Sequence, residues 1–567
     1  MVGQLLVVAA LGCEARTALP VGVADAAVVF SLAPDVLLQT RNAWPDDLDT
    51  EAVTVTEPAP EDAATLGAEG SAASSLDATG TAYLDTADAA DDAVAAGDVT
   101  WKGHEMVGRP TSHSVTIKAI AEQAVEAYVD FGTSPGAYTG NTATTTYADG
   151  IAEVVLDGLQ PDSTYGYRLR YRAAGSTTPF LSGSEYTFKT QRGRGSDFTF
   201  AVQSDSHLGY ASFNNPALYH LTMQNIAAAN PDFLLDLGDA VSLDDVIETE
   251  ATVGTKYLNQ RAYFEIPGHS ASIFLVLGNH EREEGWKLDT GSSLAASFPV
   301  LSANSRKRYF LNPVPDDFYT GNPDGMPEID GDHLRGDYYS FEWGNALFVA
   351  IDPFWYTVKK PYSGAIGGET DTAGEPIGTR WSWTLGEQQY GWLKNTLESS
   401  SAPLKFVFSH QMVGGLDDYG RGGALASKYC EFGGDDIDGA TWSWPNNRPG
   451  WDVPIHQLFM DNHVTVFFHG HDHVYAKEVQ DGIVYQEVPM AANASYDTGF
   501  SSNQTDYAGA TLLPNSGYIR VTVSQLTATV EYVRSFLSAK DGSNNSVAAS
   551  YTVPGYTQAL SDASFAP

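Results

Sequence analysis

Residues 198–207 read Phe-Thr-Phe-Ala-Val-Gln-Ser-Asp-Ser-His. Apolar side chains alternate with small or polar ones, which is the pattern of a β-strand. The strand leads into Asp205 and His207, a carboxylate and an imidazole two residues apart. Because open α/β folds bind ligands at the carboxyl ends of their strands, this position favours a functional site. A single Asp-x-His pattern is more often a structural turn, so its meaning depends on the rest of the chain.

Four later apolar runs end in the same kinds of side chain. They end in Gly238-Asp239, in Gly278-Asn279-His280-Glu281, in Ser409-His410, and in His469-Gly470-His471-Asp472-His473. Six of the thirteen histidines of the chain stand in these five strand-end segments. Carboxylate, amide and imidazole groups suit borderline and hard divalent metals, and five such strand ends are hard to explain by packing. The sequence therefore predicts a metal site.

The mixture of ligand types has a chemical reason. Two cations about 3.5–4 Å apart need a bridging anion to offset their repulsion, and a carboxylate provides it. Imidazoles and one carboxamide then fill the outer positions without adding negative charge. Such a pair of cations turns bound water into hydroxide at neutral pH and clamps the attacking and leaving oxygens of a phosphoryl group.

The order of the five motifs resembles that of the calcineurin-like metallophosphoesterases, from about Phe198 to Val533. With a β-sandwich in front, the layout also resembles purple acid phosphatases and their bacterial relatives. The resemblance implies an α/β fold, with a four-layer α/β/β/α catalytic domain preceded by an all-β, fibronectin-like sandwich. It also implies two divalent metal ions, for which Mn, Zn, Fe and Co all remain open.

The resemblance assigns roles to individual residues. Metal one would take Asp205, His207, Asp239 and His473. Metal two would take Asp239, Asn279, His410 and His471, with Asp239 as the bridge. His280 would face the substrate, as a general acid or as a stabiliser of the charged transition state.

Two departures from the purple acid phosphatase pattern matter. That group carries a metal-binding tyrosine three residues after the bridging aspartate, where this chain has Ser242. It also lacks a histidine at the position of His207. We therefore expect no tyrosinate-to-iron colour and no obligate ferric ion.

The side chains around the motifs are less specific. Arg421 stands in a Gly-rich loop after His410 and is either an exposed loop arginine or a contact for substrate phosphate. His469 either orients a metal ligand or is a buried strand histidine. For Arg306-Lys307-Arg308 we expect a solvated surface run, and for Asp352, at the end of another strand, a structural role.

The composition and periodicity of the sequence change twice along the chain. Residues 1–104 are predicted to be an export-signal remnant and an acidic leader or linker, since residues 14–100 hold 17 acidic and 2 basic residues. Residues 105–191 alternate in short runs with turn residues between them, which predicts a fibronectin type III-like β-sandwich with Tyr165 as its corner tyrosine. Residues 192–567 form the predicted catalytic domain.

Periodicity predicts several elements of the catalytic domain. A helix is expected from Pro216 to Ala229, because Asn215 can cap it and Asn230-Pro231 ends it. Helices are also expected over 387–397 and 454–461, and a β-hairpin over 517–523 and 526–533.

Charge and composition limit the partners. The chain of 567 residues has a net charge of −40, with 71 acidic and 31 basic residues, which disfavours nucleic acid and anionic membranes as general partners. No run reaches the 18 or so apolar residues of a membrane helix. With Cys13 and Cys430 as the two cysteines, a disulfide framework is not expected. A small phosphorylated substrate is expected. The sequence does not determine the oligomeric state.

The first residues leave two interpretations open. Met1–Cys13 has the apolar character of a signal peptide but lacks its positive region. It is either the remnant of an export signal, with Cys13 near the place of a lipoprotein cysteine, or a truncated or misassigned start. We expect a secreted protein, extracellular or periplasmic, with lipid anchoring through Cys13 as an open alternative.

The predicted function is hydrolysis of phosphate esters, preferentially monoesters, by a binuclear centre with a bridging hydroxide. One alternative is a phosphodiesterase acting on nucleotides or cyclic nucleotides. The other is a non-catalytic surface binding protein on the same fold. Intact ligand types at every motif argue against the latter.

Overall fold

The computed structural model describes residues 99–244, 246–361 and 378–557. The predicted leader up to residue 98, including Cys13 and the possible export signal, lies outside these ranges. Every described helix is too short or too polar to cross a lipid bilayer.

The first part of the described chain is all β-structure and packs as two antiparallel sheets. One sheet has the strand order β1-β2-β6, and the other has the order β4-β3-β7-β8, with β5 pairing β3 and β9 pairing β7. Apolar side chains between the sheets form a continuous buried cluster that includes Ile117, Val129 and Leu169. The hydroxyl of Tyr165 accepts a hydrogen bond of 2.8 Å from the backbone N–H of Gln160, as expected of a corner tyrosine. The strands are β1 (Trp101–Gly108), β2 (Val115–Ala121), β3 (Val125–Gly132), β4 (Gly140–Asn141), β5 (Thr145–Tyr147), β6 (Ile151–Leu156), β7 (Thr164–Ala173), β8 (Leu181–Ser182) and β9 (Tyr186–Lys189).

Two larger sheets form the centre of the following segment. A six-stranded sheet has the order β12-β11-β10-β21-β22-β23, and an eight-stranded sheet has the order β13-β14-β15-β16-β17-β19-β18-β20. Their strands are β10 (Phe198–Gln203), β11 (Phe233–Asp236), β12 (Ser272–Leu275), β13 (Thr320–Gly321), β14 (Tyr339–Trp343), β15 (Ala346–Ala350), β16 (Leu404–Phe408), β17 (Val466–His469), β18 (Tyr475–Gln480), β19 (Ile483–Glu487), β20 (Thr511–Leu513), β21 (Gly517–Ser524), β22 (Thr527–Arg534) and β23 (Val547–Pro554).

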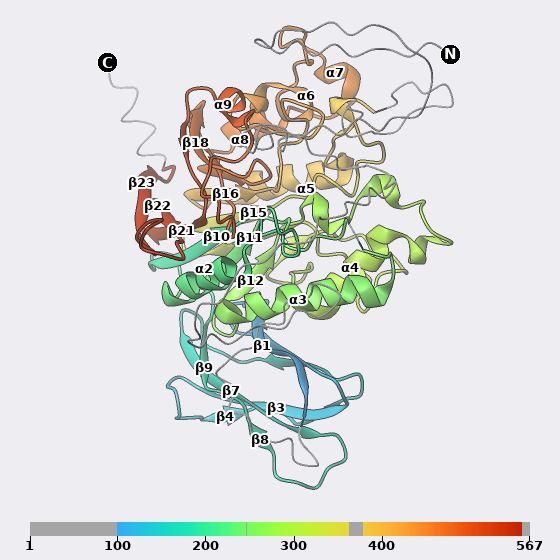
Figure 1. The fold of residues 1–567 in the computed structure, drawn as a ribbon, viewed down its shortest axis with the longest axis vertical. Helices are drawn as coiled ribbons and strands as arrows, with labels where there is room; N and C mark the ends of the chain where they lie inside the picture. The colour runs from blue at the N-terminus through green and yellow to red at the C-terminus, as the bar shows by residue number, and fades with distance from the viewer. Residues whose placement is uncertain (1–98, 245, 362–377, 558–567) are drawn as a thin grey trace, which may run out of the picture. The chain divides into compact units, whose positions relative to one another are not determined.

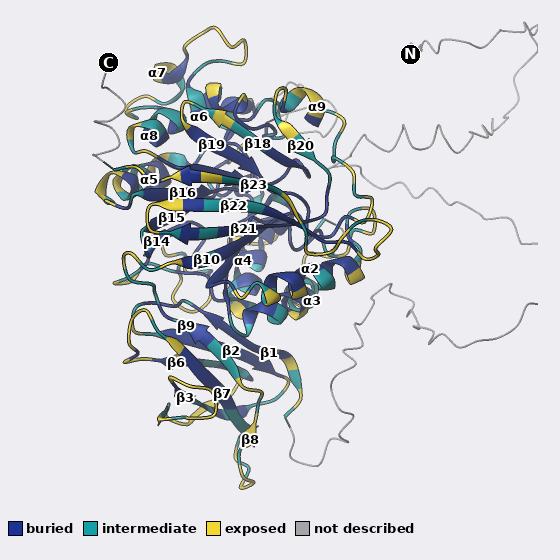
Figure 2. Cartoon of the chain, turned by 90° about the vertical axis from the view of Figure 1, so that its left-hand side faces the viewer, coloured by how far each residue is buried: buried dark blue, intermediate teal, exposed yellow. Residues whose placement is uncertain are grey.

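The two sheets pack face to face through aromatic side chains. The ring of Phe200 on β10 lies 5.0 Å from that of Phe348 and 5.4 Å from that of Phe406, both on the other sheet. These contacts belong to one large buried cluster that draws on both sheets. In Figure 2 the strands of both sheets are mostly buried.

Helices cover the outer face of each sheet. On the six-stranded sheet, α2 (Pro216–Ala228) and α3 (Glu250–Gly268) share a buried cluster with β10 to β12. On the eight-stranded sheet, α5 (Gly386–Ser399) and α8 (Ile455–Asp461) pack against β15 to β17. Figure 1 shows these two groups on opposite sides of the sheets. The result is the predicted four-layer α/β/β/α arrangement. The remaining α-helices are α4 (Phe298–Tyr309), α6 (Cys430–Gly433), α7 (Trp444–Asn447) and α9 (Asn503–Asp506).

The expected elements form where the periodicity placed them. The side chain of Asn215 caps α2 by accepting the N–H of Leu218 at 3.1 Å. Strands β21 and β22 pair as the predicted antiparallel hairpin. Within the two sheets, β10, β11 and β12 run parallel, as do β15, β16, β17 and β19. Their carboxyl ends therefore meet at one edge of each sheet, where the five motifs follow.

Buried charged side chains join the β-sandwich to the layers behind it. Lys118 donates to the carbonyl oxygens of Lys307 and Phe310 at 2.9 and 3.3 Å. Arg261 on α3 donates to the carbonyl oxygens of His104 and Lys118 at 2.6 and 2.9 Å. Because these donors are buried and satisfied by partner backbone, the contact is specific rather than a loose apposition.

Candidate metal centre

The predicted ligands stand directly after the carboxyl ends of the strands, and many have an unusual backbone. The φ angles of Asp205, His207, Asp239, His471 and His473 are 53°, 44°, 52°, 78° and 59°. This left-handed region is uncommon for residues other than glycine, and each such residue costs of order 1–3 kcal/mol unless its surroundings hold it there. The chain turns sharply at each ligand and aims the side chain back toward the sheet edges.

A first group of ligands converges at the ends of β10 and β17. Nε2 of His207 lies 2.9 Å from Nε2 of His473, and these nitrogens lie 3.6 and 3.4 Å from Oδ1 of Asp205. All three side chains are buried. The donor atoms lie close enough to one another for one metal ion to bind them together.

A second group converges on His410, at the end of β16. Its Nε2 lies 3.1 Å from Nδ1 of His471, 3.2 Å from Oδ1 of Asn279 and 3.2 Å from Oδ2 of Asp239. Asp239 also faces the first group, with Oδ2 3.8 Å from Nε2 of His207. The carboxylate of Asp239 therefore lies between the two groups, where the sequence predicted a bridge.

The spacing of the donor atoms suits shared binding of a metal ion better than direct hydrogen bonding among the donors. Donors bound about 2.1 Å from one ion lie about 3.0–3.4 Å apart, and most of these contacts have such spacings. Oδ1 of Asp205 is buried without a hydrogen-bond partner among the described residues. Two buried carboxylates need compensating positive charge, which divalent cations provide.

Ionisation in the centre is consistent with this. Burial raises the pKa of Asp205, but the adjacent His207 and His473 outweigh it and hold that pKa well below the usual range. Burial lowers the pKa of His473 to about 4. Burial, followed by the charges of His410 and Arg421, lowers the pKa of His471. His410 differs, because Asp239 outweighs burial and raises its pKa to about 9, so this imidazole carries a proton that a bound cation would have to replace. Neutral imidazoles and ionised carboxylates are the forms that ligate metals.

Neighbouring groups fix the ligands in place. Nδ1 of His410 donates to the carbonyl oxygen of Leu237 at 2.9 Å, which leaves Nε2 as the free lone pair. Glu281, the last residue of the Gly278-Asn279-His280-Glu281 motif, has a supporting role. Its carboxylate accepts the backbone N–H groups of Asp239, Ala240 and Val241 at 2.9, 2.8 and 2.9 Å and so holds the turn that carries the bridging carboxylate.

His280 lies beside the centre and is held by a residue that the sequence did not indicate. Its Nε2 is 3.7 Å from Oδ2 of Asp239, and its Nδ1 contacts the carboxylate of Asp244. The same carboxylate accepts the hydroxyl of Tyr210 at 3.1 Å and contacts Arg282. Asp244 comes five residues after Asp239, so an acidic residue shortly after the bridge was the available signal.

Three residues near the predicted ligands, Arg421, His469 and Asp352, have different surroundings. The guanidinium of Arg421 lies near the centre, with Nε 3.8 Å from Oδ1 of Asp472. Nδ1 of His469 lies 2.6 Å from Oε2 of Glu487, away from the ligand atoms. Asp352 accepts the N–H of Phe354 at 2.8 Å and closes a turn, which agrees with the structural role expected for it.

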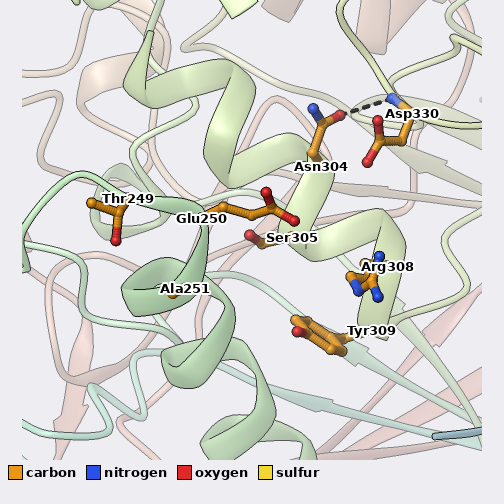
Figure 3. A pocket seen from close by; sticks show the side chains of 8 residues that line it. All are labelled: Thr249, Glu250, Ala251, Asn304, Ser305, Arg308, Tyr309 and Asp330. Carbon is orange, nitrogen blue, oxygen red and sulfur yellow. Dashed lines mark hydrogen bonds between the residues drawn. The ribbon is translucent and has the colours of Figure 1, made fainter. Parts of the chain in front are cut away.

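The expectation of a solvated basic run is wrong for Arg306. That side chain is buried and makes two hydrogen bonds, of 2.6 and 2.9 Å, to the carboxylate of Glu283. Lys307 pairs with Asp332, and only Arg308 is exposed. Arg308 lines a cavity of about 420 Å³ between α3 and α4, shown in Figure 3 with Glu250 and Asp330 on its wall. No predicted site residue lines this cavity.

Comparison with known proteins agrees with the geometry. Residues 198–475 match the family model described as calcineurin-like phosphoesterase. Among solved structures, PhoD superposes with a TM-score of 0.54 at 16% identity, over 80% of this chain and 92% of PhoD. Purple acid phosphatase PPD1 from yellow lupin (Lupinus luteus) seeds superposes with a TM-score of 0.51 at 16% identity, over 79% and 73% of the two chains. At this identity the likeness is one of fold. No curated protein matches the sequence.

Proposed function

Residues 198–475 match the calcineurin-like phosphoesterase family and the chain is a phosphoesterase, and from this premise we propose that it hydrolyses phosphate monoesters with two divalent metal ions. The observation that carries the proposal is the position of Asp239. Its carboxylate lies within 3.2 Å of His410 and 3.8 Å of His207, which belong to the two separate ligand groups.

The proposed ligands follow from the two groups. Asp205, His207, Asp239 and His473 hold metal one, and Asp239, Asn279, His410 and His471 hold metal two. The bound ions supply a hydroxide at neutral pH and offset the charge of the phosphoryl group. Nitrogen and oxygen donors in this ratio suit Mn, Zn, Fe and Co alike, so we propose the number of ions and leave their identity open.

His280 is the proposed partner of the leaving group. Asp244 holds Nδ1 of His280, so the other ring nitrogen, Nε2, is the one that faces the bridging carboxylate and the reacting phosphate. A proton on Nε2 can pass to the departing alkoxide as the P–O bond breaks. Arg421, next to Asp472 of the last motif, is the proposed contact for the ionised phosphate oxygens.

The test compares 4-nitrophenyl phosphate with bis(4-nitrophenyl) phosphate, on purified protein whose metals have been counted. Two metals per chain and a preference for the monoester are expected. Asn279→Ala and His410→Ala should each remove hydrolysis and at least one metal, whereas His113→Ala, an exposed histidine of the β-sandwich, should not. A preference for the diester would move the assignment to a phosphodiesterase. No turnover with Mn, Zn, Co or Fe would overturn it.

We also propose that the chain has three parts: a leader, a fibronectin type III-like domain and the catalytic domain from residue 192. The sequence placed the first boundary between residues 104 and 105, but β1 begins at Trp101, so the sandwich begins a few residues earlier. The strands β1 to β9 and the hydrogen bond of Tyr165 support the middle part. An apolar start before Cys13 supports export from the cytoplasm. Fractionation of cells that express the full chain tests the location, and activity confined to the cytoplasm would contradict it.

A further inference from the structure

Within the described residues, the guanidinium of Arg421 is held by two aromatic rings and an ion-pair contact with Asp472. Its carbon lies 4.5 Å from the centre of the Tyr419 ring and 4.3 Å from that of the Phe500 ring. The side chain is 16% exposed, and its Nε is buried without a hydrogen-bond partner among the described residues. Oδ1 of Asp472, 3.8 Å from this Nε, is equally buried and unpartnered. Stacking on two rings orients the planar fork, while its N–H groups stay available.

Three other arginines lie over a pair of aromatic rings and provide an internal comparison. Arg448 lies over Trp381 and Trp451, Arg335 over Trp355 and Tyr356, and Arg534 over Tyr532 and Phe536. Each of these three donates to protein oxygens: Arg448 to Glu431, Arg335 to Asp337, and Arg534 to the backbone of Asn515 and Ser516. In the part of the chain that the structure describes, Arg421 differs from all three, because it has a 3.8 Å ion-pair contact with Asp472 in place of a hydrogen bond to a protein oxygen.

The two rings that stack on Arg421, those of Tyr419 and Phe500, belong to residues that also contact proposed metal ligands. The carbonyl oxygen of Tyr419 accepts from Nε2 of His471 at 3.1 Å. The ring of Phe500 stacks on that of His473, with 4.7 Å between the ring centres. Arg421 is therefore tied to a ligand of each proposed metal ion.

The carboxylate behind the guanidinium is itself fixed. Oδ2 of Asp472 accepts the hydroxyl of Tyr507 at 2.6 Å and the backbone N–H of Gly422 at 2.7 Å. Asp472 cannot swing toward Arg421 without giving up these bonds. The charge of Arg421 is thus only partly compensated, in a chain of net charge −40.

We propose that Arg421 is the residue that makes the site selective for phosphate monoesters over diesters. A monoester carries two ionised oxygens at neutral pH, and a diester carries one. Metal ions held by the proposed ligands would offset part of the phosphoryl charge, and the fork of Arg421 takes the additional ionised oxygen, to which guanidinium geometry is matched. This inference rests on the proposed function and identifies Arg421 as the group that distinguishes the charge of a monoester from that of a diester.

The test uses two substrates with the same leaving group, 4-nitrophenyl phosphate and methyl 4-nitrophenyl phosphate. We expect Arg421→Gln to lower kcat/KM for the monoester by about 10- to 100-fold and to change that for the diester by no more than a few-fold. Arg421→Lys should recover part of the loss, because it keeps the charge without the fork. Arg308→Gln, which removes an exposed arginine at the cavity between α3 and α4, serves as the charge-matched control and should leave both values unchanged.

Metal content is measured on every variant, so that loss of folding or of metal is seen directly. An equal fall for both substrates in a metal-replete Arg421→Gln protein, or an unchanged ratio, would overturn the inference while leaving the phosphoesterase assignment intact. Failure of the unaltered protein to hydrolyse either substrate would instead contradict the proposed function.

Discussion

The backbone N–H of His471 donates a hydrogen bond of 3.0 Å to Oδ2 of Asp205, across 266 residues of sequence. This bond joins the first metal-ligand motif to the last one, and with them the ends of β10 and β17 in the two central sheets. Each motif thus orients a ligand of the other, so the site depends on the packing of one sheet against the other.

The approach of the two motifs requires a glycine at position 470. A Cβ atom there would lie 2.0 Å from Oγ of Ser204 and 2.6 Å from Oδ2 of Asp205, so something must shift. We expect Gly470→Ala to weaken metal binding by about 10- to 100-fold, as loss of a supporting contact does. Metal titration followed by calorimetry measures this. Gly391→Ala, on α5 with open space around it, is the control. Equal affinity in both variants would show that the close approach is not needed.

The role of His280 predicts a dependence on the leaving group. Without a general acid, a poor leaving group such as an alkoxide suffers more than 4-nitrophenolate, which departs without protonation. We expect His280→Ala to lose about 100- to 10,000-fold in kcat with an alkyl phosphate and clearly less with 4-nitrophenyl phosphate.

The contact between Asp244 and His280 predicts the same dependence on the leaving group, with a smaller loss of rate. Asp244→Asn should slow the alkyl phosphate more than the nitrophenyl ester, because the ring loses the carboxylate that orients it. Asp317→Asn, an exposed aspartate, is the matched control. If His280→Ala slows both esters by the same factor, His280 stabilises the charged transition state and does not transfer the proton.

Ser242 predicts the colour of an iron-loaded protein. The side chain is buried, three residues after Asp239, where purple acid phosphatases carry their metal-binding tyrosine. A hydroxymethyl group gives no phenolate charge-transfer band. We expect protein reconstituted with iron to show no violet absorption in the visible range. A visible band whose intensity follows the iron content would contradict this and would point to another phenolate at the centre.

Much of the site could be predicted because it follows directly from strand ends. The alternation in Phe198–Gln203 fixes β10, and a parallel sheet brings the carboxyl ends of its strands to one edge. The motifs after those strands therefore had to meet. The left-handed backbone at Asp205 and His471 was not predictable, since it is held by distant groups and not by local propensity.

What the sequence missed depends on contacts between remote segments. Asp244 matters because it meets His280, 36 residues later, and its place five residues after Asp239 does not by itself distinguish it from a surface aspartate. Arg306 was expected to be solvated because it stands in a basic run, but Glu283, 23 residues earlier, pairs with it in the interior. Local charge patterns describe solvent exposure only when no distant partner exists.

The contact between the β-sandwich and α3 predicts a dependence of stability on pH. Burial raises the pKa of Glu265 from 4.5 to about 7, although Arg261, whose Nε lies 3.0 Å from Oε1 of Glu265, opposes it. Because the folded pKa is the higher one, folding favours the protonated carboxyl. Its contribution is complete below pH 4.5 and is lost as the pH rises through 7, by about 3 kcal/mol in all. Glu265→Gln mimics the protonated form and should remove this loss. Urea unfolding between pH 5 and 9 measures the difference from the unaltered protein, with the exposed Glu387→Gln as control. A pH-independent difference would mean that Glu265 stays ionised beside Arg261 throughout.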